Sequence, residues 1–247
     1  MKQNIYDKPE FFAKYCSIPR STEGPNRAEE WPNFRPLLPD LRDRRVLELG
    51  CGFGWHCRYA RQQGASSVVG VDLSERMLAR ARALTDDPGI EYRRSAIEDV
   101  EFRADEFSVV ISSLALHYIR DFDAVCQRVH HWLATGGAFV FSVEHPMVTA
   151  LAAQRWCSGP NGDRLHWPVD KYQEEGPRHT QWLADDVIKY HRTVASYVNT
   201  LIESGFRLTK LIEPMPSPET WIDRPDLEDE RRRPSLLFIA ASNDPMP

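Results

Sequence analysis

Three glycines lie close together in the segment 48–54, which has the sequence E-L-G-C-G-F-G, and Asp72 follows Gly50 by 22 residues. A ligand that packs against the backbone needs positions without a Cβ, and a strand-to-helix turn often needs a positive φ. A helix that begins after such a turn offers free N–H groups and a partial positive charge. A carboxylate at the end of the next strand accepts hydrogen bonds from ribose hydroxyls. The spacing therefore predicts a nucleoside site.

The same loop narrows the choice of nucleotide. The dinucleotide fingerprint G-x-G-x-x-G requires a third glycine at position 55, where this chain has Trp55. A bulky indole there obstructs the close approach of a pyrophosphate. The phosphate-binding sequence G-K-[ST] is also absent after the glycines. We therefore expect a ligand with a ribose but no pyrophosphate.

Two histidines follow predicted strands and are candidate catalytic bases. His117 lies in the sequence A-L-H-Y and His145 in the sequence V-E-H-P. Histidine titrates near neutral pH, so either ring could take a proton from a substrate. The structural alternative is that His117 packs in a turn and that His145 caps the loop before Pro146.

Alternating strands and helices are needed to bring the glycine turn, Asp72 and the two histidines together. Apolar runs predict strands at 44–50, 67–73, 90–96, 108–114 and 138–144. Helical periodicity predicts helices at 55–63, 75–84, 122–133 and 187–202. This order favours a parallel sheet with helices on both faces, and ligands of such folds bind at the carboxyl edge of the strands.

The last part of the chain breaks the alternation. Segments 206–212 and 235–242 both have strand character, and no helix is predicted between them. Neighbouring strands without a crossover helix usually pair antiparallel. We therefore predict a mostly parallel sheet of seven strands with an antiparallel strand at the C-terminus.

Two further segments lie outside the alternation in what we expect to be a single domain spanning 1–247. Residues 1–40 precede the first strand, and residues 145–184 form a long insertion. Long connections in compact domains are often lids or binding loops, although a surface insertion with its own small core is the alternative. The insertion contains four aromatic residues that could form an acceptor slot or a cation–π cage, namely Trp156, Trp167, Tyr172 and Trp182.

Two other polar features have a structural interpretation. His191 lies on the apolar stripe of the predicted helix 187–202, so we interpret it as a core histidine. The run E-D-E-R-R-R at 228–233 is interpreted as a solvated loop, with anion recognition by its arginines as the alternative.

Composition excludes several classes of protein. The 247-residue chain has a formal net charge of −5, which argues against a nucleic-acid partner. The first twenty residues are too charged for a signal peptide, and no apolar run is long enough to span a membrane. The five cysteines include no C-x-x-C pair, and the histidines form no metal-ligand pattern. We expect a cytoplasmic protein with reduced thiols and no bound metal.

Four motifs together resemble a known family. They are 48–54, then V-V-G-V-D-L-S at 68–74, S-A-I-E-D-V-E-F at 95–102 and S-V-V-I-S-S-L-A-L-H-Y at 108–118. This series resembles the class I S-adenosylmethionine-dependent methyltransferases over about residues 40–242. It is most similar to bacterial small-molecule methyltransferases of the ubiquinone-biosynthesis-like type. The resemblance implies a doubly wound, Rossmann-like α/β fold and S-adenosyl-L-methionine as cofactor. It also implies a small-molecule methyl acceptor and a monomer or homodimer.

The resemblance also implies which residues bind the cofactor. The backbone of Gly50, Cys51 and Gly52 would face its methionine part, with Glu48 opening the motif. Asp72 would hold the ribose hydroxyls. Segment 1–40 would fold over the bound cofactor.

The remaining cofactor contacts come from the later motifs. Leu73 and Met77 would pack on adenine, although Met77 also fits ordinary core packing. Ile97 and Glu98 would meet the adenine edge. Many relatives have an aspartate where this chain has Ala96, so that contact falls to the backbone or to Glu98. The positions expected below the methionine moiety are Ser113 and Leu114.

The chemistry expected of such a site needs little from the protein. A sulfonium methyl is already electrophilic, so the protein orients the reactants and excludes water. A general base is needed only when the acceptor arrives protonated. Two alternatives remain, a nicotinamide-dependent oxidoreductase and a non-catalytic S-adenosylmethionine-binding module. A nucleic-acid methyltransferase is disfavoured by the charge and by the absence of an N-P-P-Y or D-P-P-Y sequence.

Overall fold

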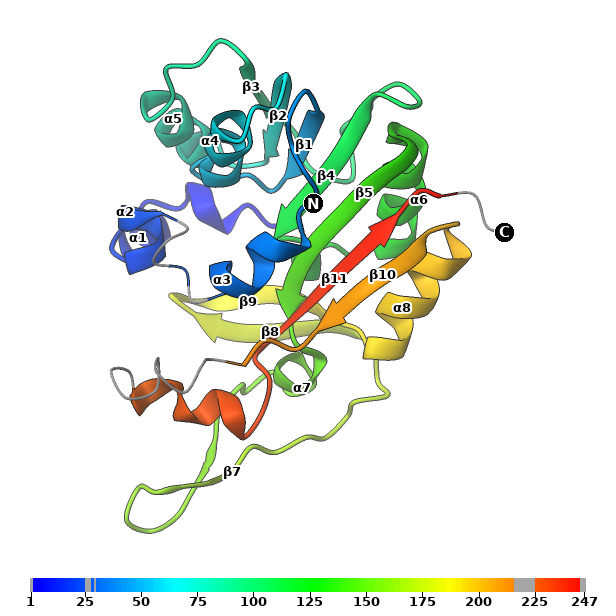
Figure 1. Ribbon diagram of the computed structural model, residues 1–247. Helices are drawn as coiled ribbons and strands as arrows, with labels where there is room; N and C mark the ends of the chain where they lie inside the picture. The colour runs from blue at the N-terminus through cyan, green and yellow to red at the C-terminus, as the bar shows by residue number, and fades with distance from the viewer. Residues whose placement is uncertain (1, 25–27, 29, 216–224, 245–247) are drawn as a thin grey trace.

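The centre of the molecule is one seven-stranded sheet (Figure 1). The computed structural model of the chain describes residues 2–24, 28, 30–215 and 225–244. The strand order is β10-β11-β5-β4-β1-β2-β3, and all strands are parallel except β11, which runs antiparallel to both β5 and β10. The predicted sheet is thereby confirmed. Its strands are β1 (Arg45–Leu49), β2 (Ser67–Asp72), β3 (Ile90–Arg94), β4 (Phe107–Ser113), β5 (Leu133–Glu144), β10 (Arg207–Ile212) and β11 (Leu236–Ser242).

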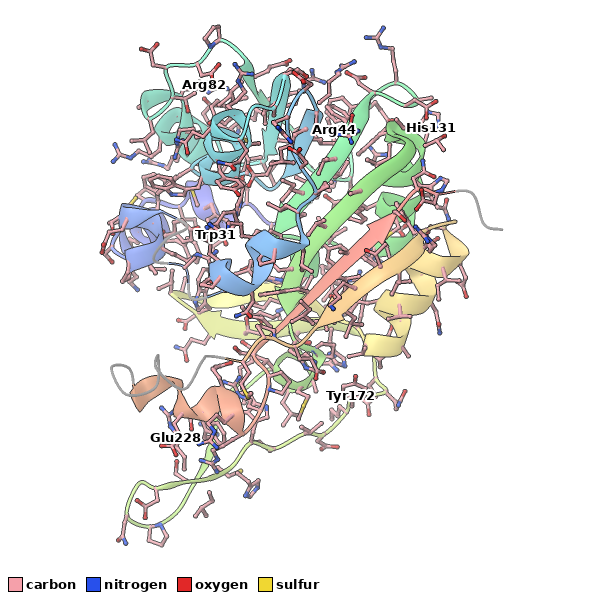
Figure 2. The ribbon with its side chains drawn as sticks, viewed as in Figure 1. Trp31, Arg44, Arg82, His131, Tyr172 and Glu228 are labelled. Atoms are coloured by element: carbon pink, nitrogen blue, oxygen red, sulfur yellow. The ribbon has the colours of Figure 1, made fainter. Side chains whose placement is uncertain are left out.

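Helices cover both faces of the sheet, which explains why the central strands are continuously apolar. On one face, α6 (Phe122–Trp132) and α8 (Val194–Glu203) pack against inward residues of β1, β4, β5 and β11. On the other face lie α3 (Trp31–Phe34) and α4 (Trp55–Gln62), together with Leu78 of α5 (Glu75–Ala83). The Trp31 ring meets Tyr59 of α4 edge-on at 4.8 Å, so part of the N-terminal segment belongs to the core (Figure 2).

The insertion after β5 contains two antiparallel hairpins. The predicted helix 187–202 is wrong over its first half, because α8 begins only at Val194. Residues 184–191 form a strand in which Val187, Lys189 and His191 are buried at alternate positions, the period of a strand. The insertion is built from α7 (Pro146–Thr149), β6 (Cys157–Ser158), β7 (Arg164–His166), β8 (Gly176–Trp182) and β9 (Ala184–His191).

The two segments outside the alternation contact each other. Ile5 and Phe11 form a small apolar cluster with Val187, and rings from both segments surround it. The Gln3 side chain donates to the carbonyl of Asp186 at 2.7 Å and accepts from the amide of Ile188 at 2.9 Å. We call residues 2–16 and the hairpin β8–β9 together the roof. Figure 1 shows β8–β9 beyond the carboxyl ends of β4 and β5. The N-terminal part contains η1 (Ile5–Asp7), α1 (Pro9–Cys16) and, after the roof, α2 (Pro19–Glu23) and η3 (Arg35–Leu37).

An outer cluster joins the first hairpin of the insertion to η5 (Pro225–Arg231). The Trp156 and Trp167 rings meet edge-on at 5.4 Å. The guanidinium of Arg232 lies 4.4 Å from the Trp156 ring, and that of Arg233 lies 4.2 Å from the Trp167 ring. Arg232 also donates to backbone carbonyls of β7. The solvated-loop interpretation of 228–233 is therefore correct only in part: Glu228, Arg231 and Arg232 are exposed, but Arg232 and Arg233 attach the segment to the hairpin.

Candidate functional site

The glycine turn lies between β1 and α4 with its backbone in the left-handed region. Gly50 has φ 76° and Gly52 has φ 52°. A Cβ on Gly50 would lie 2.4 Å from the Cβ of Ala115, whereas a Cβ on Gly52 would meet nothing within 4 Å. Gly50 therefore allows close packing with the segment after β4, and Gly52 leaves open space in front of the backbone. This geometry fits a ligand that packs on bare backbone.

Asp72 ends β2 beside this turn. Its Oδ2 accepts from the amide of Gly52 at 2.8 Å, and its Oδ1 accepts from the amide of Ser74 at 2.8 Å. Burial raises the pKa of Asp72 to about 6, although these two hydrogen bonds act in the opposite direction. A carboxylate has about four lone-pair positions, so two remain for a ligand.

A cavity of about 1020 Å³ lies between the roof and the carboxyl edge of the sheet. Its volume is slightly above the range of about 300–1,000 Å³ for small-molecule sites, which leaves room for two ligands side by side. Most of the residues predicted from the sequence line it, namely Gly50, Gly52, Asp72, Leu73, Met77, Ile97, Glu98, Ser113, Leu114 and His117. Met77 is also 2% exposed, so it serves the core and the cavity wall together.

The N-terminal segment closes the cavity next to Asp72. Asp7 accepts from the Ser74 hydroxyl at 2.5 Å and from the amide of Arg76 at 3.1 Å, so it caps α5. Burial acts to raise the pKa of Asp7, but hydrogen bonds from Ser74 and Arg76 outweigh it and lower the pKa below its usual value. Lys2 pairs with Asp99 at 2.5 Å on the adjoining wall. Sequence reasoning missed Asp7, because a cap supplied from 67 residues away leaves no local signal.

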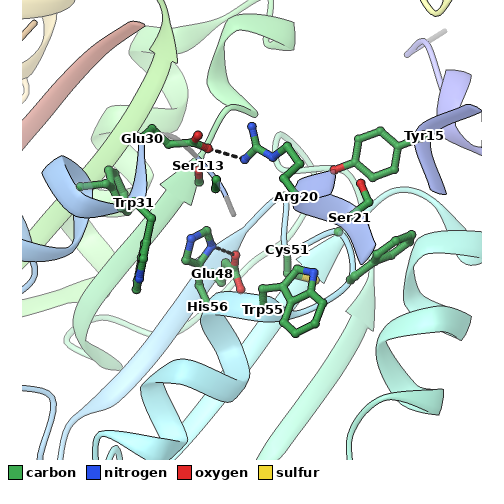
Figure 3. Close-up of a pocket in the computed structure, with 15 residues that line it drawn as sticks. Tyr15, Arg20, Ser21, Glu30, Trp31, Glu48, Cys51, Trp55, His56 and Ser113 are labelled. Atoms are coloured by element: carbon green, nitrogen blue, oxygen red, sulfur yellow. Dashed lines mark hydrogen bonds and ion pairs between the residues drawn. The ribbon is translucent and has the colours of Figure 1, made fainter. Parts of the chain in front are cut away.

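Two predicted residues lie beside the main cavity instead of in its lining. Glu48 and Cys51 line a smaller pocket of about 70 Å³ next to the glycine turn (Figure 3). Glu48 contacts the His56 ring at 2.8 Å and accepts from the amide of Cys57 at 3.0 Å. Its carboxylate therefore holds the first turn of α4 under the glycines.

Arg20 lines both the smaller pocket and the main cavity. Its guanidinium pairs with Glu30 at 2.5 Å, and Figure 3 shows it extending between Glu30 and Tyr15 near the glycine turn. This places a cation next to the bare backbone of Gly50 and Gly52. Sequence reasoning missed it because a single arginine in a loop-rich segment is not distinctive.

His117 lies in η4 (Leu116–Tyr118) and is 2% exposed. Its Nδ1 accepts from the amide of Glu144 at 3.3 Å, and its ring lines the main cavity. Burial lowers the pKa of His117 to about 4, which the nearby Glu144 only partly opposes. The ring is therefore neutral at physiological pH.

His145 does not line the main cavity or the smaller pocket. Its Nδ1 accepts from the amide of Met147 at 3.0 Å and caps α7, and its Nε2 lies 2.9 Å from Glu213. The structure thus gives His145 the capping role that was the alternative. His191 is a core histidine, as expected, but on β9: its ring nitrogens contact the Thr149 hydroxyl at 2.8 Å and the Tyr172 carbonyl at 3.0 Å.

A buried ion pair lies beside His117. The ammonium of Lys189, which is 1% exposed, contacts Glu144 at 2.5 Å and the side-chain carbonyl of Gln154 at 3.3 Å. The Gln154 amide donates to the other Glu144 oxygen at 3.1 Å. Burial acts to raise the pKa of Glu144, but His117 and Lys189 outweigh it and lower the pKa. The pair ties the insertion to the end of β5.

Only Trp182 of the four predicted slot aromatics lines the main cavity. Trp156 and Trp167 form the outer cluster, and Tyr172 lies on the loop before β8, where its hydroxyl accepts from the amide of Val194 (Figure 2). The predicted slot is therefore wrong for these three. The cavity draws its rings from the roof and from the turn after β4 instead: Tyr6, Tyr15, Tyr118, Trp182 and Tyr190.

In the described part of the chain, the His, Cys, Asp and Glu side chains form no group of three or more that could hold a metal ion. None of the helices in these same residues has the length and apolar character needed to cross a bilayer.

Comparison with known proteins gives consistent matches. A family model described as a methyltransferase domain matches residues 47–141. An S-adenosylmethionine dependent methyltransferase from Mesorhizobium loti, solved as a crystal structure, is 46% identical with a TM-score of 0.84; the match covers 89% of this chain and 100% of that one. A Listeria monocytogenes structure assigned to the same class is 49% identical with a TM-score of 0.84, over 89% of this chain and 98% of that one.

A more distant relative has a named reaction. N-demethylindolmycin N-methyltransferase from Streptomyces griseus is 26% identical over 181 residues, which cover 70% of this chain and 73% of that protein.

Proposed function

Because the chain belongs to the class I S-adenosylmethionine-dependent methyltransferases, we propose that the main cavity binds this cofactor together with a small-molecule methyl acceptor. The observation that carries the proposal is one open wall formed by bare backbone at Gly50 and Gly52 and by the carboxylate of Asp72. The fit to the cofactor is good, because this wall offers backbone without a Cβ, a ribose acceptor and room for a second molecule. The small-molecule acceptor is further supported by the net charge and by the Streptomyces griseus relative.

Each part of the cofactor would find a complementary surface. Asp72 would accept from the ribose hydroxyls, and Leu73 and Met77 would pack on adenine. The backbone of 50–52 would face the amino-acid part, with Arg20 near its carboxylate. The other wall positions would be Ile97, Glu98, Ser113 and Leu114.

The cofactor supplies an electrophilic methyl group, and the chain's own contribution is positioning. With both ligands bound, the roof would exclude water from the cavity through Gln3, Ile5 and the rings around them. Holding two reactants in the correct geometry accounts for roughly 7–11 kcal/mol of a bimolecular barrier. Residues 1–40 would cover the cofactor, and Trp182 and Tyr190 of the insertion would face the acceptor.

Trp55 argues against the alternative of a nicotinamide-dependent oxidoreductase. The guanidinium of Arg58 lies 4.4 Å from its ring, which also approaches Gly24, so the indole is held at the start of α4. The dinucleotide fingerprint has its third glycine at this position, where it allows the helix to pack closely on the strand. An absorbance change with NADH and a substrate pool would revive that alternative.

We expect Asp72→Ala to weaken S-adenosylhomocysteine binding by about 1–3 kcal/mol, because a charged hydrogen-bond acceptor is lost. Isothermal titration calorimetry measures the change directly. Asp86→Ala, at an exposed carboxylate on the loop before β3, is the control and should leave the affinity unchanged. Equal affinities in both variants would mean that Asp72 does not hold the ribose.

Cofactor affinity should also depend on pH through Asp72. Its pKa is about 6 in the free chain, and ribose hydroxyls donate best to the ionised form. Affinity should therefore be constant above pH 7 and fall below pH 6, by up to about tenfold per pH unit. Calorimetry at pH 5 and 7.5 measures this, and Asp72→Asn should remove the dependence. The same slope in Asp72→Asn would assign the titration to another group.

The reaction itself is tested with methyl-labelled S-adenosylmethionine and a bacterial metabolite extract. The proposal expects a small molecule in the extract to gain the label. If titration calorimetry showed no heat of binding and the Tm did not change with either S-adenosylmethionine or S-adenosylhomocysteine, the proposal would be wrong.

A further inference from the structure

We propose that His117 acts as a hydrogen-bond donor, through Nε2–H, that positions a carbonyl or carboxylate oxygen of the methyl acceptor, and that it is not a general base. This inference rests on the proposed function and specifies the chemistry of the acceptor. Three features of the site carry it: the tautomer of the ring, the free nitrogen and the surrounding charges.

The tautomer follows from the end of β5. The amide of Glu144 donates to Nδ1 of His117 at 3.3 Å. A backbone amide is always a donor, so Nδ1 must be the unprotonated nitrogen. A neutral imidazole carries its one proton on the other nitrogen, which places a donor at Nε2.

Nε2 of His117 has no hydrogen-bond partner among the described residues, although the side chain is 2% exposed. It is also not among the buried polar atoms sealed from solvent without a partner. Because the ring lines the cavity, this N–H is left for a molecule that enters it. If the methyl acceptor displaces water and leaves this N–H without a partner, its binding free energy is weakened by about 1–3 kcal/mol. A methyl acceptor with an oxygen opposite Nε2 is therefore favoured.

The groups that face the ring act against its use as a base. Burial is the largest cause of its low pKa, and Lys189 and Arg192 lower it further, whereas only Glu144 raises it. Tyr118 packs on the ring at 4.4 Å and has a raised pKa, so it supplies no charge. Glu144, the carboxylate beside the ring, is paired with Lys189, which reduces its repulsion of an oxygen of the acceptor.

The acceptor class follows from this arrangement. A molecule held by Nε2–H has a carbonyl-type oxygen close to the reacting atom. That atom reaches the methyl group with a free lone pair, as a neutral amine, a heteroaromatic nitrogen or a carboxylate does, because His117 does not remove a proton from it. An aliphatic hydroxyl, which needs a base, is not expected.

The tautomer can be tested without knowing the acceptor. Long-range proton–nitrogen NMR of ¹⁵N-histidine-labelled protein, bound to S-adenosylhomocysteine, resolves the protonation of each ring nitrogen, and His117→Gln identifies the signals. We expect the Nε2–H tautomer from pH 5.5 to 8, with titration near pH 4. An Nδ1–H tautomer, or titration near 6.5, would overturn the proposal. Failure of S-adenosylhomocysteine to bind would instead contradict the proposed function.

Kinetics with the molecule that gains label from the metabolite extract provide the second test. His117→Gln keeps an N–H at the end of the side chain but cannot act as a base. It should retain the wild-type KM for the acceptor within about threefold, whereas His117→Ala should raise that KM about tenfold with unchanged S-adenosylhomocysteine affinity. Equal loss of kcat in both variants, or a labelled product without a carbonyl-type oxygen, would overturn the proposal.

Discussion

Lys189→Met is expected to lower the free energy of unfolding by about 3 kcal/mol, since removing one member of a buried ion pair leaves the other charge uncompensated. Lys189 is almost fully buried, and its ammonium lies 2.5 Å from Glu144. Glu144 faces the cavity and retains Gln154, so the value lies at the lower end of those found for buried pairs. Urea denaturation measures the change.

A double variant separates charge from packing in this prediction. Lys189→Met combined with Glu144→Gln removes both charges, so most of the lost stability should return. Lys171→Met removes an exposed lysine whose ammonium lies 3.8 Å from Glu174, and it should change stability by less than about 0.5 kcal/mol. If Lys189→Met were as stable as Lys171→Met, the pair would contribute nothing to folding.

Gly50→Ala should destabilise the fold by a similar amount, about 3 kcal/mol. The left-handed backbone at φ 76° costs a residue with a Cβ roughly 1–2 kcal/mol. The new Cβ would also lie 2.4 Å from that of Ala115, and overpacking of this kind costs about 1–3 kcal/mol. Thermal unfolding should show the loss.

Gly162→Ala is the matched control for this substitution. Gly162 has φ 85° in the β6–β7 hairpin, and a Cβ there would meet nothing within 4 Å. It should therefore show only the backbone cost. Equal losses in the two variants would show that the contact with Ala115 relaxes freely and that close packing at the turn is unimportant.

The floor of the cavity could be predicted because its signals are local. Gly50, Gly52 and Asp72 each lie at the end of a strand, and parallel strands bring their carboxyl ends to one edge. The chain order of strands and helices therefore positions these residues without knowledge of distant contacts. The same reasoning brought His117 to the cavity.

The prediction failed where long-range packing decides the structure. The stripe from 187 to 202 satisfies a helical period, yet β9 forms because β8 supplies a partner strand and the roof buries alternate residues. His145 follows a strand just as His117 does, but α7 begins at Pro146 and takes the ring as its cap. Trp156 and Trp167 have arginine partners more than sixty residues away, which no spacing rule reveals.

The two hydrogen bonds between Gln3 and the backbone of β9 have a consequence for the rate of product release. Gln3 and Asp186 are 183 residues apart in sequence, and we expect spent cofactor to leave where this contact opens. The two Gln3 hydrogen bonds, one from Lys14 to the Leu183 carbonyl and a small apolar cluster hold the two parts together, and we expect this contact to open on the microsecond-to-millisecond scale typical of lids. The residence time of the product, and therefore the maximum turnover rate, would then depend on how tightly residues 2–16 are held against the β8–β9 hairpin.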